Sequence, residues 1–319
     1  MTNHFRIFSG RSNLPLAQKI SRKVKHRLNK IEITDFPDSE IHIKLKESVR
    51  GRDVFIIQSL SRFANHSVND ALMELCLILD AVKRASAKKV VAIIPYLGYA
   101  RQEKMITGRE PISARLAIDN IVNAGADGIV AFDLHSPAIQ GFAKVPFDNL
   151  TPFCILVDYW RKKKLKNAVI VSPDAGRARL ADKYAKALNL PLVLMHKGRV
   201  KDKVKIELVA GEIKGKIPII TDDLIAGGSI INHVKSLIEL GAKKEIYISI
   251  THPAFCGKAK ERLSHSAIKE IVTTDTIDVL PEYRFKNIKF LSVSSILAEA
   301  IDLIHKEKSI KSLYLANYL

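Results

Sequence analysis

Cysteine is scarce in this chain. Its 319 residues include three cysteines, Cys76, Cys154 and Cys256, which lie far apart in mostly apolar surroundings. No two of them have the Cys-x-x-Cys spacing of a zinc knuckle or a redox motif. We therefore expect neither disulfides nor a structural zinc site, and the reducing cytoplasm is the expected compartment.

Long apolar segments are also missing. The apolar run VVAIIPY, at residues 90–96, is far shorter than the roughly 20 residues that a membrane-spanning helix needs. The first residues, MTNHFRIFSGRSN, lack the apolar core of a secretory signal. These absences predict a cytoplasmic protein without a membrane partner.

Acidic and aromatic residues are few relative to basic ones. Lysine and arginine number 51 against 33 acidic residues, which gives a net charge of +18, and aromatics make up 7%. Such a charge suits polyanionic partners, either nucleic acid or phosphorylated small molecules. The basic residues are spread along the chain, however, and no basic stripe interleaved with aromatics suggests stacking on bases. The composition therefore favours a phosphorylated small molecule, and we expect no nucleic-acid partner.

Short apolar runs alternate with helical patterns through almost the whole chain. The expected strands are residues 53–59, 89–96, 128–134, 168–174, 217–223 and 245–251. Between them, residues 69–86, 113–126, 178–189 and 229–242 have apolar side chains spaced near 3.6 residues. Near-continuous apolar strands joined by helices predict an α/β fold with parallel sheets covered on both faces.

The alternating pattern also repeats within the chain. LILDAVKRASAKKVVAIIPY at 77–96 and SLIELGAKKEIYISITHP at 236–253 share a helix, a small-residue turn, paired lysines, a strand and a proline. This repeat predicts two similar α/β domains, residues 1–150 and 151–319, that arose by duplication. The last residues are expected to pack on the N-terminal domain.

Polar residues follow five of the expected strands. The segments after these strands read LGYARQEK, DLHSP, PDAGR, HKGRVKDK and DDLIAGGS. Because ligands of open parallel sheets bind beyond the carboxyl ends of the strands, we expect one composite site.

The segment DDLIAGGS joins two carboxylates, Asp222 and Asp223, to a glycine turn. Glycines let the backbone approach a phosphate, and the helix after them is expected to offer free N–H groups. Ser229 is expected either to cap that helix or to donate its hydroxyl to the phosphate. Carboxylates beside such a cradle fit a sugar phosphate, whose hydroxyls they would bind. The alternative is an ordinary turn with a solvated acid pair.

Two further segments carry candidate metal ligands. Alternation along an extended chain would place Asp133 and His135 on one side, and Asp174 follows a proline and precedes a glycine. Carboxylate and imidazole both ligate divalent metals, although magnesium prefers oxygen. A structural histidine and a plain turn are the alternatives.

Taken together, these segments resemble the ribose-phosphate pyrophosphokinases, or phosphoribosyl diphosphate synthases. The resemblance covers nearly the whole chain and is carried by residues 36–59 (FPDSEIHIKLKESVRGRDVFIIQS), 69–102 (ending in YARQ), 133–142 (DLHSPAIQGF), 170–176 (IVSPDAG) and 272–277 (VTTDTI). It implies two phosphoribosyltransferase-like domains and transfer of diphosphate from ATP to the C1 hydroxyl of ribose 5-phosphate. The products would be phosphoribosyl diphosphate and AMP. It also implies a homo-oligomer whose ATP site is shared between subunits.

The resemblance assigns a role to each matching position. ATP would be bound by Phe36, Asp38, Ser39, Glu40, Arg101, Gln102 and His135. Mg²⁺ would be held by His135 and Asp174. The catalytic pair, Lys197 and Arg199, would neutralise the diphosphate from a segment expected to act as a closing loop. Ribose 5-phosphate would be bound by Asp222, Asp223, Ala226, Gly227, Gly228 and Ser229.

The phosphate loop departs from the family pattern. DDLIAGGSI is one residue shorter than usual and lacks both usual threonines, which leaves Ser229 as its hydroxyl. Loss of a phosphate-binding hydroxyl would cost about 1–3 kcal/mol. In milder departures, Gly198 replaces an arginine and Ser39 a glycine. A catalytically weak homologue that regulates a true synthase is therefore one alternative, and a phosphoribosyltransferase is another. We favour a working diphosphokinase, because the lysine, the arginine and both metal positions persist.

Overall fold

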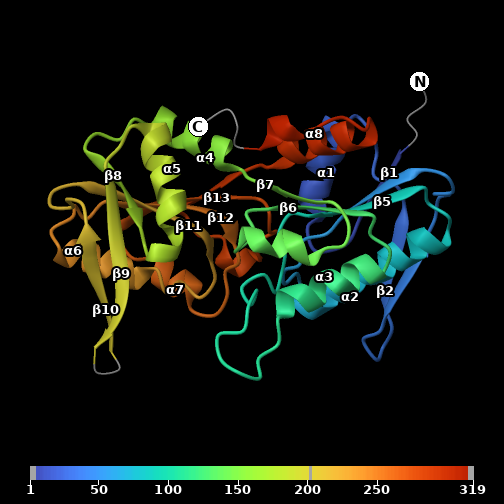
Figure 1. Ribbon diagram of the computed structural model, residues 1–319, viewed down its shortest axis with the longest axis horizontal. Coiled ribbons are helices and arrows are strands. Elements are labelled where there is room, and N and C mark those ends of the chain that lie inside the picture. The colour runs from blue at the N-terminus through green and yellow to red at the C-terminus, as the bar shows by residue number, and fades with distance from the viewer. Residues whose placement is uncertain (1–4, 201–202, 315–319) are drawn as a thin grey trace. The chain divides into compact units, whose positions relative to one another are not determined.

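A computed structural model describes the backbone of residues 5–200 and 203–314, and the side chains of residues 197–209 lie outside the described residues. The chain forms two compact units (Figure 1). The first unit comprises the residues up to 151 with 276–278 and 292–314, and the second comprises 152–275 with 279–291. The chain therefore passes between the units twice in each direction.

The sheet of the first unit has five parallel strands in the order β1-β4-β5-β6-β7. Their bounds are Phe5–Ser9 for β1, Asp53–Ile57 for β4, Lys89–Ile94 for β5, Gly128–Phe132 for β6 and Phe147–Leu150 for β7. These runs are rich in β-branched and aromatic side chains, which pack well on a pleated surface.

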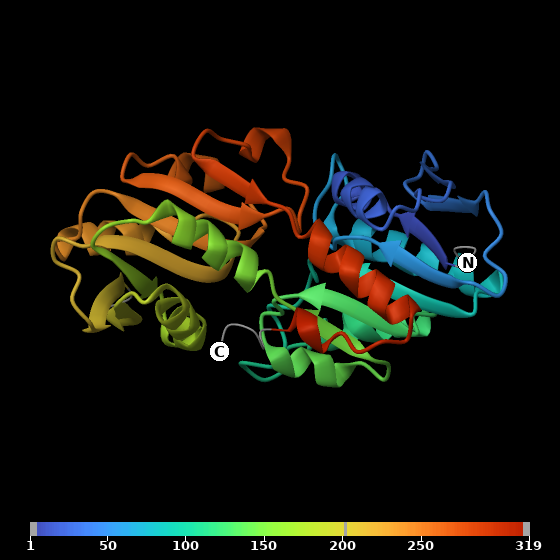
Figure 2. The same cartoon turned by 90° about the horizontal axis from the view of Figure 1, so that it is seen from above.

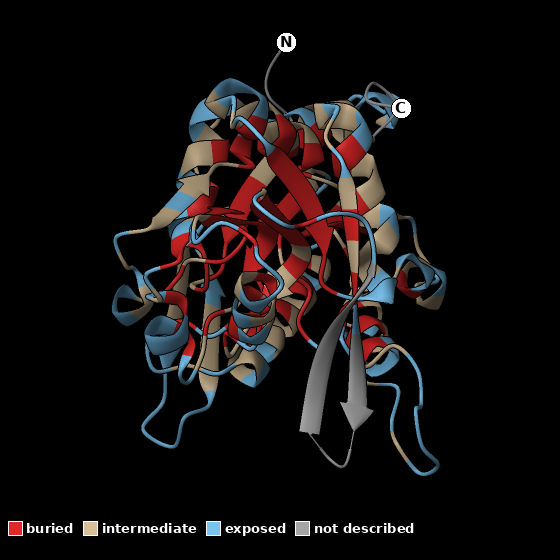
Figure 3. Ribbon diagram, turned by 90° about the vertical axis from the view of Figure 1, so that its left-hand side faces the viewer, coloured by how far each residue is buried: buried red, intermediate tan, exposed pale blue. Residues whose placement is uncertain are grey.

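Helices cover both faces of this sheet (Figure 2). They are α1 (Leu14–Lys23), α2 (Val68–Arg84), α3 (Ser113–Asn123) and α8 (Ser294–His305). Successive strand residues point to opposite faces, so Ile7 and Phe55 pack with α1 and α8, whereas Phe8 and Ile56 pack with α2 and α3. Figure 3 shows that the buried residues concentrate in the strands.

A separate two-stranded hairpin belongs to the first unit. Its strands, β2 (Ile31–Asp35) and β3 (Ile41–Leu45), are antiparallel, and Ile33 lies opposite Ile43. Both isoleucines pack against the core on the α2 side of the sheet. The sequence patterns did not predict this hairpin.

The start of α2 is fixed by a capping box. The Ser67 backbone N–H donates to Asp70 Oδ2 at 2.6 Å, and the Asp70 N–H donates to Ser67 Oγ at 3.3 Å. These two bonds satisfy donors that the first turn of a helix leaves without a partner.

The sheet of the second unit has seven strands in the order β10-β9-β8-β11-β12-β13-β14. Their bounds are Ala168–Ser172 for β8, Leu192–Val200 for β9, Lys203–Ala210 for β10, Ile217–Ile225 for β11, Ile246–Pro253 for β12, Ile268–Thr274 for β13 and Ile288–Leu291 for β14. All neighbours are parallel except β9 and β10, which are antiparallel.

Helices again cover both faces. They are α4 (Phe153–Lys163), α5 (Ala178–Leu188), α6 (Ile231–Glu239) and α7 (Ala259–Leu263). Short 3₁₀ turns lie at Ala175–Arg177 and Pro281–Tyr283 in this unit, and at Pro137–Phe142 and Lys311–Leu313 in the first. Ile170 and Ile219 pack with α4 and α5, and Val169 and Ile220 pack with α6 and α7. The predicted α/β class with mostly parallel sheets flanked by helices is confirmed. None of the helices in the described ranges is long and apolar enough to span a membrane.

Candidate active site

The acid pair of the second unit lies on a central strand. β11 is flanked by β8 and β12, and Asp222 lies opposite Ile250. The prediction that the strand ends at the carboxylates is wrong, because β11 continues to Ile225. Successive strand residues point to opposite faces, so Asp222 and Asp223 leave the backbone in different directions.

Arg177 bridges both carboxylates. This residue ends the 3₁₀ turn that follows β8, and its Nε lies 3.1 Å from Asp222 Oδ1 while its Nη2 donates to Asp223 Oδ2 at 2.7 Å. Burial, followed by the negative charge of Asp223, raises the pKa of Asp222 well above its usual range. The guanidinium opposes this shift. Sequence reasoning missed Arg177, although it directly follows the glycine of SPDAG.

Asp174 stands beside this pair at the carboxyl end of β8, the strand next to β11. Its Oδ1 accepts the N–H of Arg177 at 3.1 Å, and its side chain is exposed. The structure therefore brings Asp174, Arg177, Asp222 and Asp223 together in one unit. This turn holds the guanidinium where it meets both acids.

The glycine turn after β11 is closely packed at Gly228. Its φ is +75°, and a Cβ there would lie 3.2 Å from the Cα of Ala259, whereas the carbonyl of Gly227 accepts Arg262 Nη1 at 2.7 Å. A side chain at Gly228 would thus be strained and crowded. Ala226 is tied by its carbonyl to the N–H of Cys256 at 3.2 Å.

Two expectations for the start of α6 are wrong. The helix is preceded by Ile230, without a side-chain cap, so Ser229 does not cap it. The first-turn N–H groups of Ile231, Asn232 and His233 donate to the carbonyls of residues 228, 229 and 230 and are not free. The exposed Ser229 hydroxyl remains the other expected phosphate contact.

Lys197 and Arg199 lie on β9, where their backbones pair with residues 206 and 204 of β10. Their side chains lie outside the described residues. The segment expected to act as a closing loop contains parts of the antiparallel strands β9 and β10, and its closure stays a prediction.

The expected ATP contacts of the first unit begin at the tip of the hairpin. The N–H of Phe36 donates to the carbonyl of Glu40 at 2.8 Å, the N–H of Ser39 donates to the carbonyl of Phe36 at 2.9 Å, and the N–H of Glu40 donates to Asp38 Oδ1 at 3.3 Å. Ser39 has φ +78°, which matches a three-residue hairpin loop that ends in a left-handed residue. The Phe36 ring is half exposed.

The remaining expected ATP contacts lie after β5 and β6. Arg101 is exposed, and the Gln102 side chain accepts the Ser113 hydroxyl at 2.5 Å, which ties Gln102 to the start of α3. His135 is half-buried in the loop after β6. The expected shared side of Asp133 and His135 is not supported, because Asp133 has φ +34° and the chain bends there.

Potential metal ligands are sparsely placed in this structure's described residues. In the parts of the chain that the structure describes, no three or more acids, histidines and cysteines lie close enough to hold a metal ion. Magnesium in nucleotide sites is held by one or two carboxylates together with phosphate oxygens and water. The exposed carboxylate of Asp174, at a strand end, fits that mode.

The second unit carries two carboxylates, an arginine and a glycine turn toward the carboxyl ends of neighbouring parallel strands, where α/β sheets bind their ligands. These features define an α/β protein with a candidate ligand site. Family models agree: residues 5–125 match the N-terminal domain of ribose phosphate pyrophosphokinase, and residues 197–315 match the phosphoribosyl synthetase-associated domain. The ribose-phosphate pyrophosphokinase of Fusobacterium nucleatum is 42% identical over 316 residues, 98% of each chain. That of Bacillus subtilis is 42% identical over 313 residues, 98% of this chain and 97% of its own.

A solved structure is also similar over nearly the whole chain. The phosphoribosylpyrophosphate synthetase from Mycobacterium smegmatis superposes with a TM-score of 0.89 at 37% identity, over 96% of this chain and 100% of its own. The chain belongs to the ribose-phosphate pyrophosphokinase family.

Proposed function

We propose that this protein transfers the diphosphate of ATP to the C1 hydroxyl of ribose 5-phosphate, forming phosphoribosyl diphosphate and AMP. The observation that carries the proposal is the acid pair on β11 followed directly by the tight glycine turn, in a chain that matches pyrophosphokinases over its full length. The C1 oxygen attacks the β-phosphorus in line, the bond from that phosphorus to the α-phosphate oxygen breaks, and AMP leaves.

The second unit is the ribose 5-phosphate side of the reaction. Asp222 and Asp223 accept the ribose hydroxyls, and the turn from Ala226 to Ser229 surrounds the 5-phosphate. Arg177 offsets part of the charge of the acid pair, so the sugar hydroxyls enter a site of reduced negative charge.

The first unit is the ATP side. Its contacts are Phe36, Asp38, Ser39, Glu40, Arg101, Gln102 and His135. The half-exposed ring of Phe36 offers a surface on which the adenine can stack.

Lys197 and Arg199 neutralise the charge of the diphosphate as it moves. Phosphoryl transfer depends on alignment and charge stabilisation more than on covalent chemistry, and two cations at alternate positions of β9 serve that purpose. Mg²⁺ held by His135, Asp174 and the ATP phosphates would supply further charge neutralisation when bound.

We also propose a cytoplasmic homo-oligomer whose ATP site is shared between subunits. Exposed apolar side chains support an interface on the first unit: Met73 on α2, Leu116 on α3, and Met105, Ile106 and Ile112 before α3. A mixture of Glu40→Ala and Lys197→Ala subunits should recover activity that neither variant has alone. Verified mixed oligomers without activity would argue against a shared site.

The reaction is tested by AMP formation from ATP and Mg²⁺, with and without ribose 5-phosphate. We expect AMP that depends on ribose 5-phosphate, lost in Lys197→Ala and kept in Lys243→Ala, an exposed lysine in the turn before β12. A wild-type protein that binds ATP but releases no AMP would instead support the regulatory homologue. The engaged N–H groups at the start of α6 favour that alternative, because they leave fewer donors for a phosphate.

A further inference from the structure

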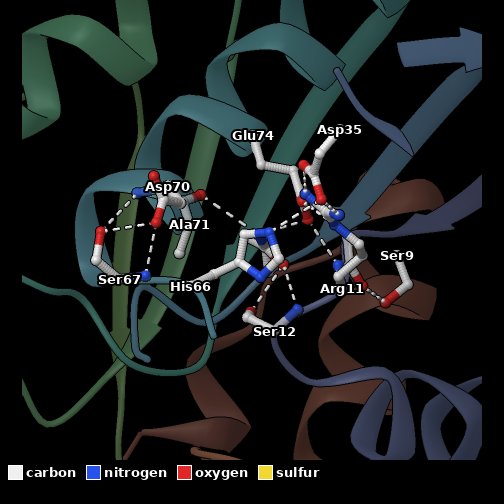
Figure 4. A network of polar contacts seen from close by, with 11 residues as sticks. Ser9, Arg11, Ser12, Asp35, His66, Ser67, Asp70, Ala71 and Glu74 are labelled. Carbon is white, nitrogen blue, oxygen red and sulfur yellow. Dashed lines mark hydrogen bonds and ion pairs between the residues drawn. The ribbon is translucent and has the colours of Figure 1, made fainter. Parts of the chain in front are cut away.

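The side chain of Arg11, two residues after β1, joins three elements of the first unit (Figure 4). Its Nε donates to Glu74 Oε2 on α2 at 2.6 Å. Its Nη1 and Nη2 donate to the two carboxylate oxygens of Asp35 at 2.7 and 2.8 Å. Asp35 is the last residue of β2 and directly precedes Phe36.

The Glu74 end of this bridge is rigid. The Glu74 carboxylate is fully buried, and its Oε1 accepts the backbone N–H of Arg11 at 2.6 Å and Gln58 Nε2 at 2.9 Å. A Cβ on residue 10 would lie 2.7 Å from Glu74 Oε1. The backbone can therefore approach the Glu74 carboxylate this closely only because residue 10 is glycine. A buried carboxylate needs all of these partners, which fixes Arg11 relative to α2 and the sheet.

The Asp35 end of the bridge lies beside the tip of the hairpin, where Asp35 pairs with Ile41. A two-stranded hairpin is marginally stable alone, and the isoleucines that anchor this one lie along its strands below the tip. The hydrogen bonds from Arg11 lower the pKa of Asp35 to about 2, because they favour the charged form of the carboxylate. His66 Nε2 lies 3.1 Å from Asp35 Oδ2, and its ring stacks on Phe63, which lies below the Arg11 guanidinium.

We propose that Arg11 is a positioning residue for ATP: it ties the tip of the β2–β3 hairpin to α2, and thereby holds Phe36, Asp38 and Glu40 in the orientation that meets the nucleotide. This role rests on the proposed function of the hairpin tip. Arg11 itself does not touch the reacting atoms. A planar fork that meets two carboxylates at once is a task for arginine, and lysine cannot reproduce it.

The test uses Asp35→Asn in the full-length protein, because Arg11→Met would leave Glu74 buried without its cation and could unfold the unit. The matched control is Asp80→Asn, which removes an exposed carboxylate paired with Arg84 on α2 at 2.7 Å. Hydrogen exchange of residues 35–42 and the affinity for ATP are measured in each protein. The expected result is about tenfold faster exchange and about tenfold weaker ATP binding in Asp35→Asn, with no change in Asp80→Asn.

Kinetics then separate positioning from a structural effect. The KM for ATP should rise while kcat and the KM for ribose 5-phosphate stay at wild-type values, and exchange in β5 should not change. Unchanged hairpin exchange overturns the proposal, and so does faster exchange with unchanged ATP affinity. A wild type without AMP formation would refute the proposed reaction, whereas exchange and equilibrium ATP binding would still decide the role of Arg11.

Discussion

Replacing Arg177 by methionine should destabilise the second unit, and by more at pH 8 than at pH 5. The variant keeps the apolar part of the side chain but removes the cation that bridges Asp222 and Asp223. Breaking a buried pair costs about 3–5 kcal/mol. The three side chains retain 17%, 22% and 7% exposure, so solvent reduces the expected loss to about 2–3 kcal/mol at pH 8.

The pH dependence follows from Asp222. The pKa of this carboxyl is raised in the folded state, so its ionisation lowers stability as the pH rises from the unfolded value toward the folded one. Without Arg177 the pKa of Asp222 in the folded state rises further. The pH range over which its ionisation lowers stability therefore becomes wider. Because the raised pKa of Asp222 favours uptake of a proton as the pH falls, less unpaired charge remains at pH 5, and the loss should be about 1 kcal/mol smaller there than at pH 8.

Urea unfolding followed by tryptophan fluorescence measures this effect. Trp160 is the single tryptophan of the chain and is buried in the second unit, so its emission reports on that unit. Arg161→Met is the matched control, because Arg161 forms an exposed pair with Asp158 at 2.8 Å and should lose less than about 1 kcal/mol. Equal losses at both pH values, or a loss no larger than that of the control, would refute the reasoning.

Three further predictions concern single positions. Gly228→Ala should cost about 1–2 kcal/mol of stability and weaken ribose 5-phosphate binding, because its φ is +75° and its Cβ would press on α7; Gly227→Ala, whose Cβ would lie 3.7 Å from its nearest neighbour, should cost less stability, and equal losses in the two variants would contradict the strain. Ser249→Ala should lower the urea stability by about 1–2 kcal/mol, since the buried Trp160 Nε1 donates to this hydroxyl at 2.9 Å; stability equal to the wild type would show that the indole finds another acceptor. Ser39→Gly should slow hydrogen exchange at the hairpin tip by relieving about 1 kcal/mol of left-handed strain, and faster exchange would contradict this.

The central sheets could be predicted from the sequence because their signals are local. A buried parallel strand such as GIVAF is apolar at every position, and the helices around it have a clear 3.6-residue period. The β2–β3 hairpin was not predicted, although IEITD and IHIKL alternate apolar and polar side chains as half-buried strands do.

The sequence pointed to Asp222 and Asp223 as site candidates, but it did not point to Arg177 or Arg11. Asp222 and Asp223 are adjacent in the sequence and stand out beside glycines. Arg177 lies 46 residues from Asp223, and Arg11 lies 63 residues from Glu74. Such pairs form only when distant strand ends meet, and no periodicity within a short window encodes them.

The position of α8 affects how the first unit folds during synthesis. Leu297 and Ile301 from this C-terminal helix are fully buried against Leu16, Ile20 and Phe55 of the first unit. During synthesis the ribosome therefore releases most of the first unit with one face of its sheet covered by α1 but not by α8, and α8 arrives only after residues 152–291, which form most of the second unit, have been translated. Such a delay exposes apolar surface to chaperones and to aggregation. Truncations that stop before residue 294 should consequently be poorly soluble, even though they retain all of the proposed catalytic and binding residues.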